Sequence, residues 1–205
     1  TVLMPGEEFS YNGVVGRRTA ARGFLPAPAY VGGETVQETG GGVCQGSSTV
    51  YLAALRSNLE IVERYPHGYI TRYVPDGMDA TVYYGAKDFR FRNNTPFPIQ
   101  VVGSVSGRSL TVSILGTKSD NITVEMTNQT VGTTGYKTVY KVDSSLPAGS
   151  TRVSVTPYAG YTVKVYRNLY ENGKLKDTKL ESTSVYRSRD KVVLVSPEDA
   201  AQYGL

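Results

Sequence analysis

Few residue types in this sequence could do covalent chemistry, because its 205 residues contain one cysteine and one histidine. Cys44 follows the run Gly40-Gly41-Gly42-Val43 and precedes apolar residues at helical spacing. At the first turn of a helix, unpaired backbone N–H groups and the helix dipole favour a thiolate over a thiol. We therefore expect Cys44 to be a nucleophile. The alternative is a buried structural cysteine, which is common for free cysteines.

A cysteine nucleophile usually needs a base, and His67 is the one histidine available. It lies in Tyr65-Pro66-His67-Gly68-Tyr69, so the competing interpretation is a histidine in a surface loop. A third group should orient the imidazole, and Asp79, Asp88 and Asp76 are all candidates. The catalytic set that we expect is Cys44, His67 and Asp79.

Residues beside these groups are candidates for holding a substrate. The backbone N–H groups of Gly42, Val43 and Cys44 could stabilise an oxyanion. Arg72 and Tyr73 could contact a substrate carboxylate, although a solvated arginine is an equally ordinary role. The full set of expected substrate-binding residues is Gly42, Val43, Gln45, Ser47, Ser48, Arg72 and Tyr73. Ser47 and Ser48 could also simply fill first-turn positions of the helix.

Composition argues against several other classes of protein. A single cysteine excludes an internal disulfide and a cysteine-rich zinc site, so we expect no metal and no cofactor. The net charge of +4 is spread without a basic stripe, so we expect no nucleic-acid partner. We also expect the protein to be a monomer. The sequence shows no membrane-spanning run and no signal peptide. It begins at Thr1 without an initiator methionine and reads as a fragment.

The elements that must position these residues are mostly strands, since Tyr, Val and Thr are frequent. One helix is expected from Gln45 to about Asn58, and the turn Asn172-Gly173 indicates a hairpin. Expected strands cover 59–64, 79–84, 89–92, 99–103, 110–115, 151–156, 162–166 and 191–195, and a short helical tail covers 197–201.

The predicted fold is therefore α+β, with a mixed or antiparallel sheet and one main helix that starts at the cysteine. Glycine-rich turns are replaced by alternating Val, Thr, Tyr and Lys at about 118–121. We expect two domains, a catalytic domain over 1–118 and an all-β, elongated domain over 119–205.

Several motifs of the first domain resemble VanW domains, in the same order along the chain. They are Val2–Asn12, Gly40–Tyr51, His67 with Tyr73–Val82, and Asp88–Thr95 with Pro98-Ile99, so that the resemblance covers residues 1 to about 116. It implies peptidoglycan L,D-transpeptidation, with the family's cysteine at Cys44. It does not assign roles to His67 or Asp79. Gly46 departs from the pattern, which has a bulkier residue there.

The second domain resembles G5 domains more loosely, through Pro147-Ala148-Gly149, Tyr158–Tyr161 and the strand pattern up to Val195. G5 modules are elongated β structures associated with wall-bound proteins. The resemblance implies that this domain engages cell-wall glycan.

Together these observations predict an extracytoplasmic protein, held at the cell wall or membrane by segments outside this sequence. The expected activity is that of a cysteine acyltransferase of the L,D-transpeptidase type, which cross-links peptidoglycan stem peptides through a Cys44 thioester. One alternative is a peptidoglycan peptidase or carboxypeptidase, in which water resolves the thioester. Another is a non-enzymatic wall-binding module with a structural Cys44.

Overall fold

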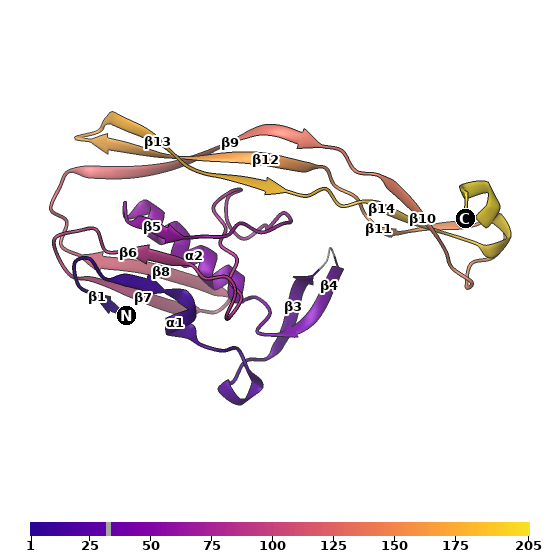
Figure 1. The fold of residues 1–205 in the computed structure, drawn as a ribbon, viewed down its shortest axis with the longest axis horizontal. Coiled ribbons are helices and arrows are strands. Elements are labelled where there is room, and N and C mark those ends of the chain that lie inside the picture. Colours follow the sequence, from indigo (N-terminus) through magenta and orange to yellow (C-terminus); the bar gives the residue numbers. More distant parts are fainter. Residues whose placement is uncertain (32–33) are drawn as a thin grey trace. The chain divides into compact units, whose positions relative to one another are not determined.

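The computed structural model describes residues 1–31 and 34–205 and is mostly β-structure with few helices (Figure 1). These residues cluster into two compact units. The first comprises Thr1–His67, Thr71–Gln129 and Val163–Ser184, and the second comprises Gly68–Ile70, Thr130–Thr162 and Val185–Leu205. The division does not follow a single cut between 118 and 119, because residues beyond 119 contribute to both units.

The first unit contains two small antiparallel sheets and a hairpin. β7 (Ile99–Ser106) lies between β1 (Val2–Leu3) and β8 (Ser109–Gly116). β6 (Arg90–Arg92) lies between β2 (Glu8–Ser10) and β5 (Glu60–Glu63). The hairpin of β3 (Pro26–Val31) and β4 (Glu34–Thr39) ends next to Gly40. Two short helical segments precede the hairpin, α1 (Tyr11–Val15) and the 3-10 helix η1 (Ala20–Arg22).

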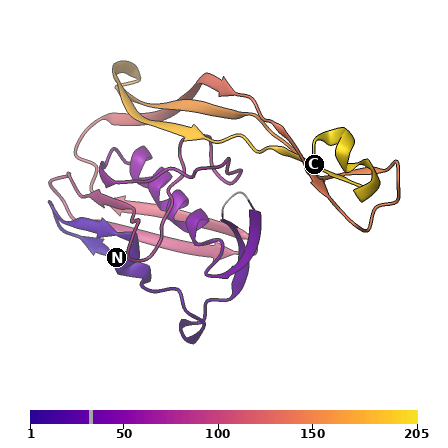
Figure 2. The ribbon, with the colours of Figure 1, turned by 45° about the vertical axis from the view of Figure 1, so that its right-hand side comes forward.

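Helix α2 (Val43–Arg56) carries much of the core of this unit. In both ribbon views it lies against the face of the sheet that contains β7 and β8 (Figures 1 and 2). Leu55 is fully buried, and Tyr51 packs edge-on against Phe89 with ring centroids 5.3 Å apart. Burying a large apolar side chain contributes about 1.5–3 kcal/mol. The buried face therefore holds the helix in place, and with it the cysteine at its start.

Strands from the second half of the sequence form a further sheet in the order β13-β12-β9. These strands are β9 (Ile122–Thr134), β12 (Gly160–Glu171) and β13 (Lys174–Tyr186). Asn172 and Gly173 both have positive φ and form the β12–β13 turn, as the sequence predicts. Within the first unit, Arg167 pairs with Glu181 at 2.9 Å and donates to the Leu59 carbonyl at 2.9 Å. This buried arginine ties β12 to the residues that follow α2.

The second unit is built on β14 (Lys191–Val195). β10 (Thr138–Val142) pairs with it in parallel and β11 (Thr151–Val155) pairs antiparallel. The chain then forms the 3-10 helix η2 (Pro197–Tyr203), capped by the Ser196 side chain. Tyr203 packs against Tyr140 with ring centroids 4.6 Å apart. The expected helical tail at 197–201 is therefore a 3-10 helix.

The expected strand over 79–84 is wrong. These residues are irregular, apart from an isolated bridge between Tyr83 and Lys87. The physical reason lies in α2, where the Ser47 and Ser48 side chains bond to the backbone of Ala80. Backbone groups satisfied in this way need no neighbouring strand. The hairpin β3–β4 and helix α1 were not predicted from the sequence.

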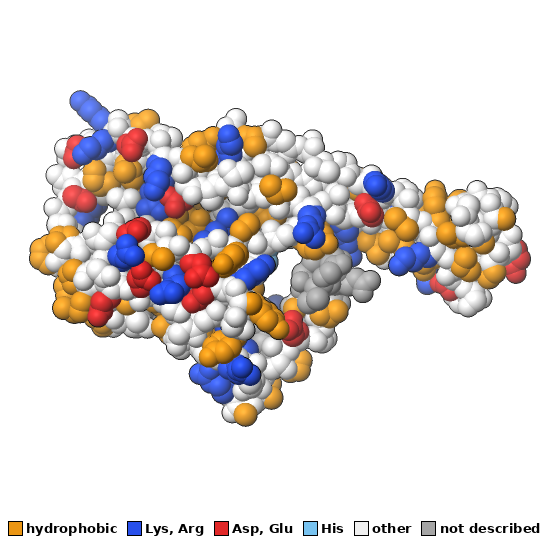
Figure 3. Space-filling model, in the orientation of Figure 1, with side chains coloured by type: hydrophobic (Ala, Val, Ile, Leu, Met, Phe, Trp, Pro, Cys, Tyr) orange, Lys and Arg blue, Asp and Glu red, His pale blue; other side chains and the backbone are white. Residues whose placement is uncertain are grey.

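Basic and acidic side chains are interspersed on the face shown in Figure 3. On the sheet β2-β6-β5, Glu8 pairs with Arg90 and Arg92, and Arg92 also pairs with Glu60. Such partly exposed pairs contribute little to the free energy of unfolding, because solvent screens them. Among the residues that the structure describes, no helix is both long and apolar enough to span a membrane.

Candidate active site

A glycine turn sets the start of α2. Gly42 caps the helix with φ +83°, a conformation that favours glycine. A Cβ on Gly41 would lie 2.1 Å from the Ala27 carbonyl oxygen of β3, so the turn packs directly on the hairpin. The helix begins at Val43, which makes Cys44 its second residue. The sulfur is thus held at the positive end of the helix dipole.

The free N–H groups at this helix end are fewer than the sequence indicates. Val43 N–H donates to the Gly40 carbonyl at 3.3 Å. Neither Gly42 N–H nor Cys44 N–H forms a hydrogen bond with another described residue. The expectation that Gly42, Val43 and Cys44 all offer oxyanion donors is therefore corrected, because the Val43 N–H is engaged.

His67 is bound to Asp79 through two short hydrogen bonds. Asp79 Oδ2 accepts from the His67 backbone N–H and from Nδ1, each at 2.6 Å. Because Nδ1–H donates to a carboxylate, Nε2 is the nitrogen left for chemistry. The Asp79 side chain is fully buried, whereas the His67 side chain is 19% exposed. The buried carboxylate thus orients an imidazole that remains open to solvent.

Arg64 holds this carboxylate in place, a role that the sequence did not indicate. Its guanidinium donates to Asp79 Oδ1 at 3.2 Å and to the Asp79 carbonyl at 2.7 Å. It also donates to the Gly77 carbonyl and to Ser184 Oγ, both at 2.9 Å. All of these groups belong to the first unit. The Arg64 side chain, which is 6% exposed, therefore holds the backbone of both Gly77 and Asp79 in place.

The Cys44 and His67 side chains lie close enough to shift each other's pKa. Burial disfavours the charged imidazole, but the hydrogen bonds and charges of Asp79 and Cys44 outweigh it and raise the pKa of His67 to about 9. Burial also opposes the thiolate, yet the hydrogen bond and charge of His67 lower the pKa of Cys44 below its usual range. The pair therefore favours a thiolate beside an imidazolium.

Arg18 is a second arginine that the sequence did not single out. Its positive charge also lowers the pKa of Cys44. The guanidinium donates to Asn12 Oδ1 at 2.6 Å and stacks over the Tyr11 ring at 5.7 Å. The Tyr11 hydroxyl donates to the Val43 carbonyl at 3.3 Å. A Cβ on Gly46 would lie 2.5 Å from the Tyr11 hydroxyl oxygen. Gly46 thus makes room for the tyrosine that supports Arg18.

Ser47 and Ser48 do not face a substrate, which corrects the expectation from the sequence. Both side chains are fully buried. Ser47 Oγ donates to the Ala80 carbonyl at 2.6 Å, and Ser48 Oγ accepts from the Ala80 N–H at 2.9 Å. In the thiol form, Cys44 donates to the Val82 carbonyl at 3.6 Å. These contacts fasten the segment after Asp79 to the first turn of α2.

The remaining candidates divide into those near the pair and those away from it. The Tyr73 hydroxyl lies 3.2 Å from His67 Nε2. Gln45 and Arg72 are exposed and form no side-chain hydrogen bond or ion pair with described residues. Asp88 is bonded to Ser10 and to the Asn12 N–H, so it supports helix α1 instead of the imidazole.

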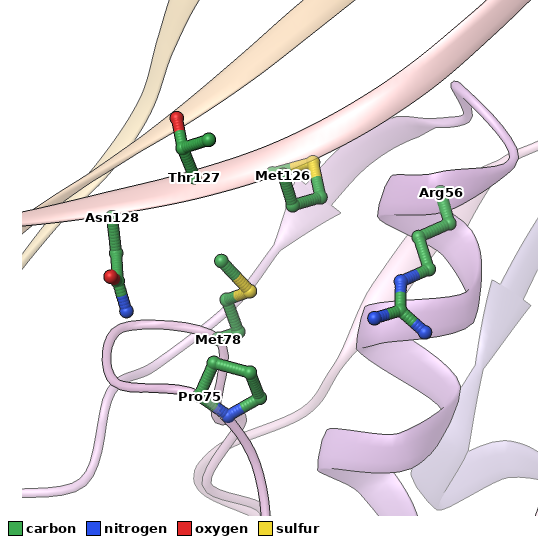
Figure 4. Close-up of a pocket in the computed structure, with 6 residues that line it drawn as sticks. All are labelled: Arg56, Pro75, Met78, Met126, Thr127 and Asn128. Atoms are coloured by element: carbon green, nitrogen blue, oxygen red, sulfur yellow. The ribbon is translucent and has the colours of Figure 1, made fainter.

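The carbonyl of Asp76, the third candidate, accepts from the Asn128 side chain at 2.8 Å. A separate pocket of about 330 Å³ lies beside it, lined by Arg56, Pro75, Met78, Met126, Thr127 and Asn128 (Figure 4). None of these residues is a candidate catalytic group. Within the described residues, no cluster of three or more His, Cys, Asp or Glu is placed to hold a metal.

The structure therefore places Cys44 near His67, whose Nδ1 is hydrogen-bonded to Asp79. Cys44 is half-buried and packs against the hydrophobic core of the first unit. A thiolate beside an imidazolium, with a free N–H at a helix start, is suited to nucleophilic attack on a carbonyl.

Two domain families match this sequence. The family described as "VanW like protein" matches residues 1–115. The G5 domain matches residues 122–197. The resemblances to VanW and, more loosely, to G5 domains are thereby confirmed.

Two curated relatives extend the comparison. "Uncharacterized protein YoaR" of Bacillus subtilis is 45% identical over 113 residues, which cover 55% of this chain and 37% of the relative. "Vancomycin B-type resistance protein VanW" of Enterococcus faecalis is 23% identical over 137 residues, which cover 63% of this chain and 49% of the relative. The chain thus spans less than half the length of either relative.

Two solved structures resemble the second part of the chain at low TM-scores. "Crystal structure of HP0197-G5" shares 24% identity at TM-score 0.21, covering 37% of this chain and 97% of that one. "IgA1 Protease G5 domain structure" shares 16% identity at TM-score 0.26, covering 38% and 94%. TM-scores this low establish no common fold.

Proposed function

The chain belongs to the VanW family, and on this basis we propose that it is a peptidoglycan L,D-transpeptidase that works through a thioester on Cys44. The observation that carries the proposal is a cysteine at the start of α2 near a histidine that Asp79 orients. The VanW and G5 domains indicate a cell-wall-associated protein, which supports peptidoglycan as the substrate.

In the first half-reaction, the Cys44 thiolate attacks the carbonyl at the L-centre of the diamino acid in a stem tetrapeptide. The carbonyl oxygen becomes an oxyanion, which the Cys44 N–H can stabilise. The carbon–nitrogen bond then breaks, and the imidazolium of His67 gives its Nε2 proton to the departing amine of the terminal D-alanine. The products are free D-alanine and an acyl group bound to Cys44 as a thioester.

In the second half-reaction, the side-chain amine of a neighbouring stem attacks the thioester. Neutral His67 removes a proton from this amine, the new amide bond forms, and the Cys44 thiolate leaves. Asp79 keeps Nδ1 protonated through both steps, so that Nε2 is always the nitrogen that exchanges protons. The site thereby returns to the thiolate–imidazolium state with two stems cross-linked.

The G5 segment would hold this chemistry near its substrate by binding wall glycan, and we place the protein outside the cytoplasm for the same reason. Effective concentration near a bound polymer raises the rate of acyl transfer between stems. Binding of purified peptidoglycan sacculi by this chain, measured by co-sedimentation, tests the partner.

The activity is tested by incubating the protein with purified stem tetrapeptides and identifying the products by mass spectrometry. Cross-linked dimers from the wild type, and none from Cys44→Ala, support the proposal. Tripeptide with free D-alanine but no dimer would assign a carboxypeptidase. The absence of any product from the wild type would leave the non-enzymatic wall-binding function.

A further inference from the structure

Tyr73 lies at the open side of the Cys44–His67 pair. Its hydroxyl is 3.2 Å from His67 Nε2, and its ring meets the imidazole edge-on with centroids 6.1 Å apart. Nδ1 is engaged by Asp79, so the Tyr73 hydroxyl lies beside the nitrogen that is left for chemistry. Tyr73 is 38% exposed, which places the hydroxyl where an incoming substrate would meet the pair.

Attack on a carbonyl creates a need that the helix start meets only in part. The oxyanion is the oxygen of the carbonyl that Sγ attacks. Oxyanion-binding sites usually provide it with more than one hydrogen-bond donor. Gly42 N–H and Cys44 N–H are available among the described residues, but Val43 N–H already donates to Gly40. The Tyr73 hydroxyl lies 3.2 Å from His67 Nε2, the nitrogen that protonates the leaving group, and is therefore a candidate for a further donor.

The chemistry and support of the Tyr73 hydroxyl suit this role. Burial first, and then the negative charges of Cys44 and Asp79, raise the pKa of Tyr73 above its usual range. The hydroxyl therefore stays protonated at every pH at which Cys44 reacts. The Tyr73 ring packs edge-on against the imidazole, whose orientation Asp79 fixes. A donor held in advance costs little reorganisation when charge develops.

We propose that Tyr73 is a catalytic residue whose hydroxyl, together with the Cys44 N–H, binds the oxyanion formed when Cys44 attacks a carbonyl. The inference rests on the proposed acyl transfer through Cys44. The hydroxyl proton remains on Tyr73 throughout, and the hydrogen bond shortens as the oxygen becomes negative. His67 separately supplies the proton that the leaving group takes.

The variant Tyr73→Phe tests this, because it keeps the ring against His67 and removes only the hydroxyl. Two reactions of Cys44 are compared. Acylation by p-nitrophenyl acetate passes through an oxyanion, whereas alkylation by iodoacetamide displaces iodide and forms none. We expect acylation to slow about a hundredfold and alkylation to change less than about threefold. The matched control is Tyr65→Phe, a tyrosine of equal exposure at 37%, which should alter neither rate.

An equal loss in both reactions would overturn the inference, because Tyr73 would then act on the thiolate and imidazole instead of the oxyanion. Unchanged acylation would overturn it as well. The stem tetrapeptide serves as a third reagent with the wild type. Reaction with the ester but not the tetrapeptide refutes the proposed substrate and leaves the Tyr73 result standing, whereas no reaction with either refutes both.

Discussion

Replacing Asp79 with Asn removes one negative charge from the site while keeping the size of the side chain. Asp79 Oδ2 accepts from the backbone N–H and Nδ1 of His67, both at 2.6 Å. An amide offers the imidazolium no counter-charge, but the burial that disfavours the charged ring remains. We therefore expect Asp79→Asn to lower the pKa of His67, and the thiolate that depends on this imidazolium should then form at higher pH.

The size of the effect follows from the pKa of His67. Its rise from 6.5 to about 9 corresponds to about 3 kcal/mol in favour of the imidazolium, at about 1.4 kcal/mol per pH unit. Asp79 and Cys44 share this contribution, and a hydrogen bond to a charged group provides about 1.5–3 kcal/mol. Asp79 provides part of this contribution, so the midpoint of Cys44 ionisation should rise in Asp79→Asn, by at most about two pH units.

The assay is the rate of Cys44 alkylation by iodoacetamide as a function of pH, with adducts counted by intact-protein mass spectrometry. The matched control is Asp88→Asn, since this carboxyl bonds the Asn12 N–H at 2.8 Å and supports α1. Thermal melting confirms that each variant is folded. Superimposable pH profiles for the wild type and Asp79→Asn, or an equal shift in Asp88→Asn, would refute the reasoning.

Three further expectations follow from the same geometry. Arg64→Met removes the arginine that pairs with the buried Asp79, so it should lower the free energy of unfolding by about 3–5 kcal/mol in urea denaturation. In the control Arg56→Met, which replaces an exposed arginine, the free energy of unfolding should change by less than about 0.5 kcal/mol. Gly41→Ala forces the turn away from the Ala27 carbonyl, so iodoacetamide labelling of Cys44 should slow and the melting temperature should fall. The rate of thioester formation should decline above about pH 9, where His67 loses the proton that the leaving amine needs, and also at low pH, where the thiolate is protonated.

Much of the site's composition was predictable because the sequence offers so few reactive groups. The sequence has one cysteine, which closely follows three glycines, and one histidine, so a Cys–His pair could only be Cys44 and His67. The structure brings Cys44, His67 and Asp79 together. The choice among three aspartates was open at the sequence level. It depends on how the irregular segment 64–89 folds, which no periodic pattern records.

The groups that position the site could not be read from local sequence. Arg64 donates to Ser184, which is 120 residues away along the chain. Arg18 stacks over the Tyr11 ring, and the Tyr11 hydroxyl donates to the Val43 carbonyl at the start of α2. Contacts between residues far apart along the chain produce no pattern in a short window of sequence, so they could not be predicted from it. The segment after Asp79 alternates like a strand, yet the buried Ser47 and Ser48 side chains satisfy its backbone. Tertiary hydrogen bonds thus overrode strand propensity.

The most direct test of covalent catalysis by Cys44 is the intact mass of the protein, acid-quenched shortly after mixing with a stem tetrapeptide and without an acceptor stem. The account predicts an added mass equal to that of the tetrapeptide minus that of free D-alanine, located on Cys44 by peptide mapping and released by hydroxylamine. An unmodified protein whose Cys44 nevertheless reacts rapidly with iodoacetamide would contradict it.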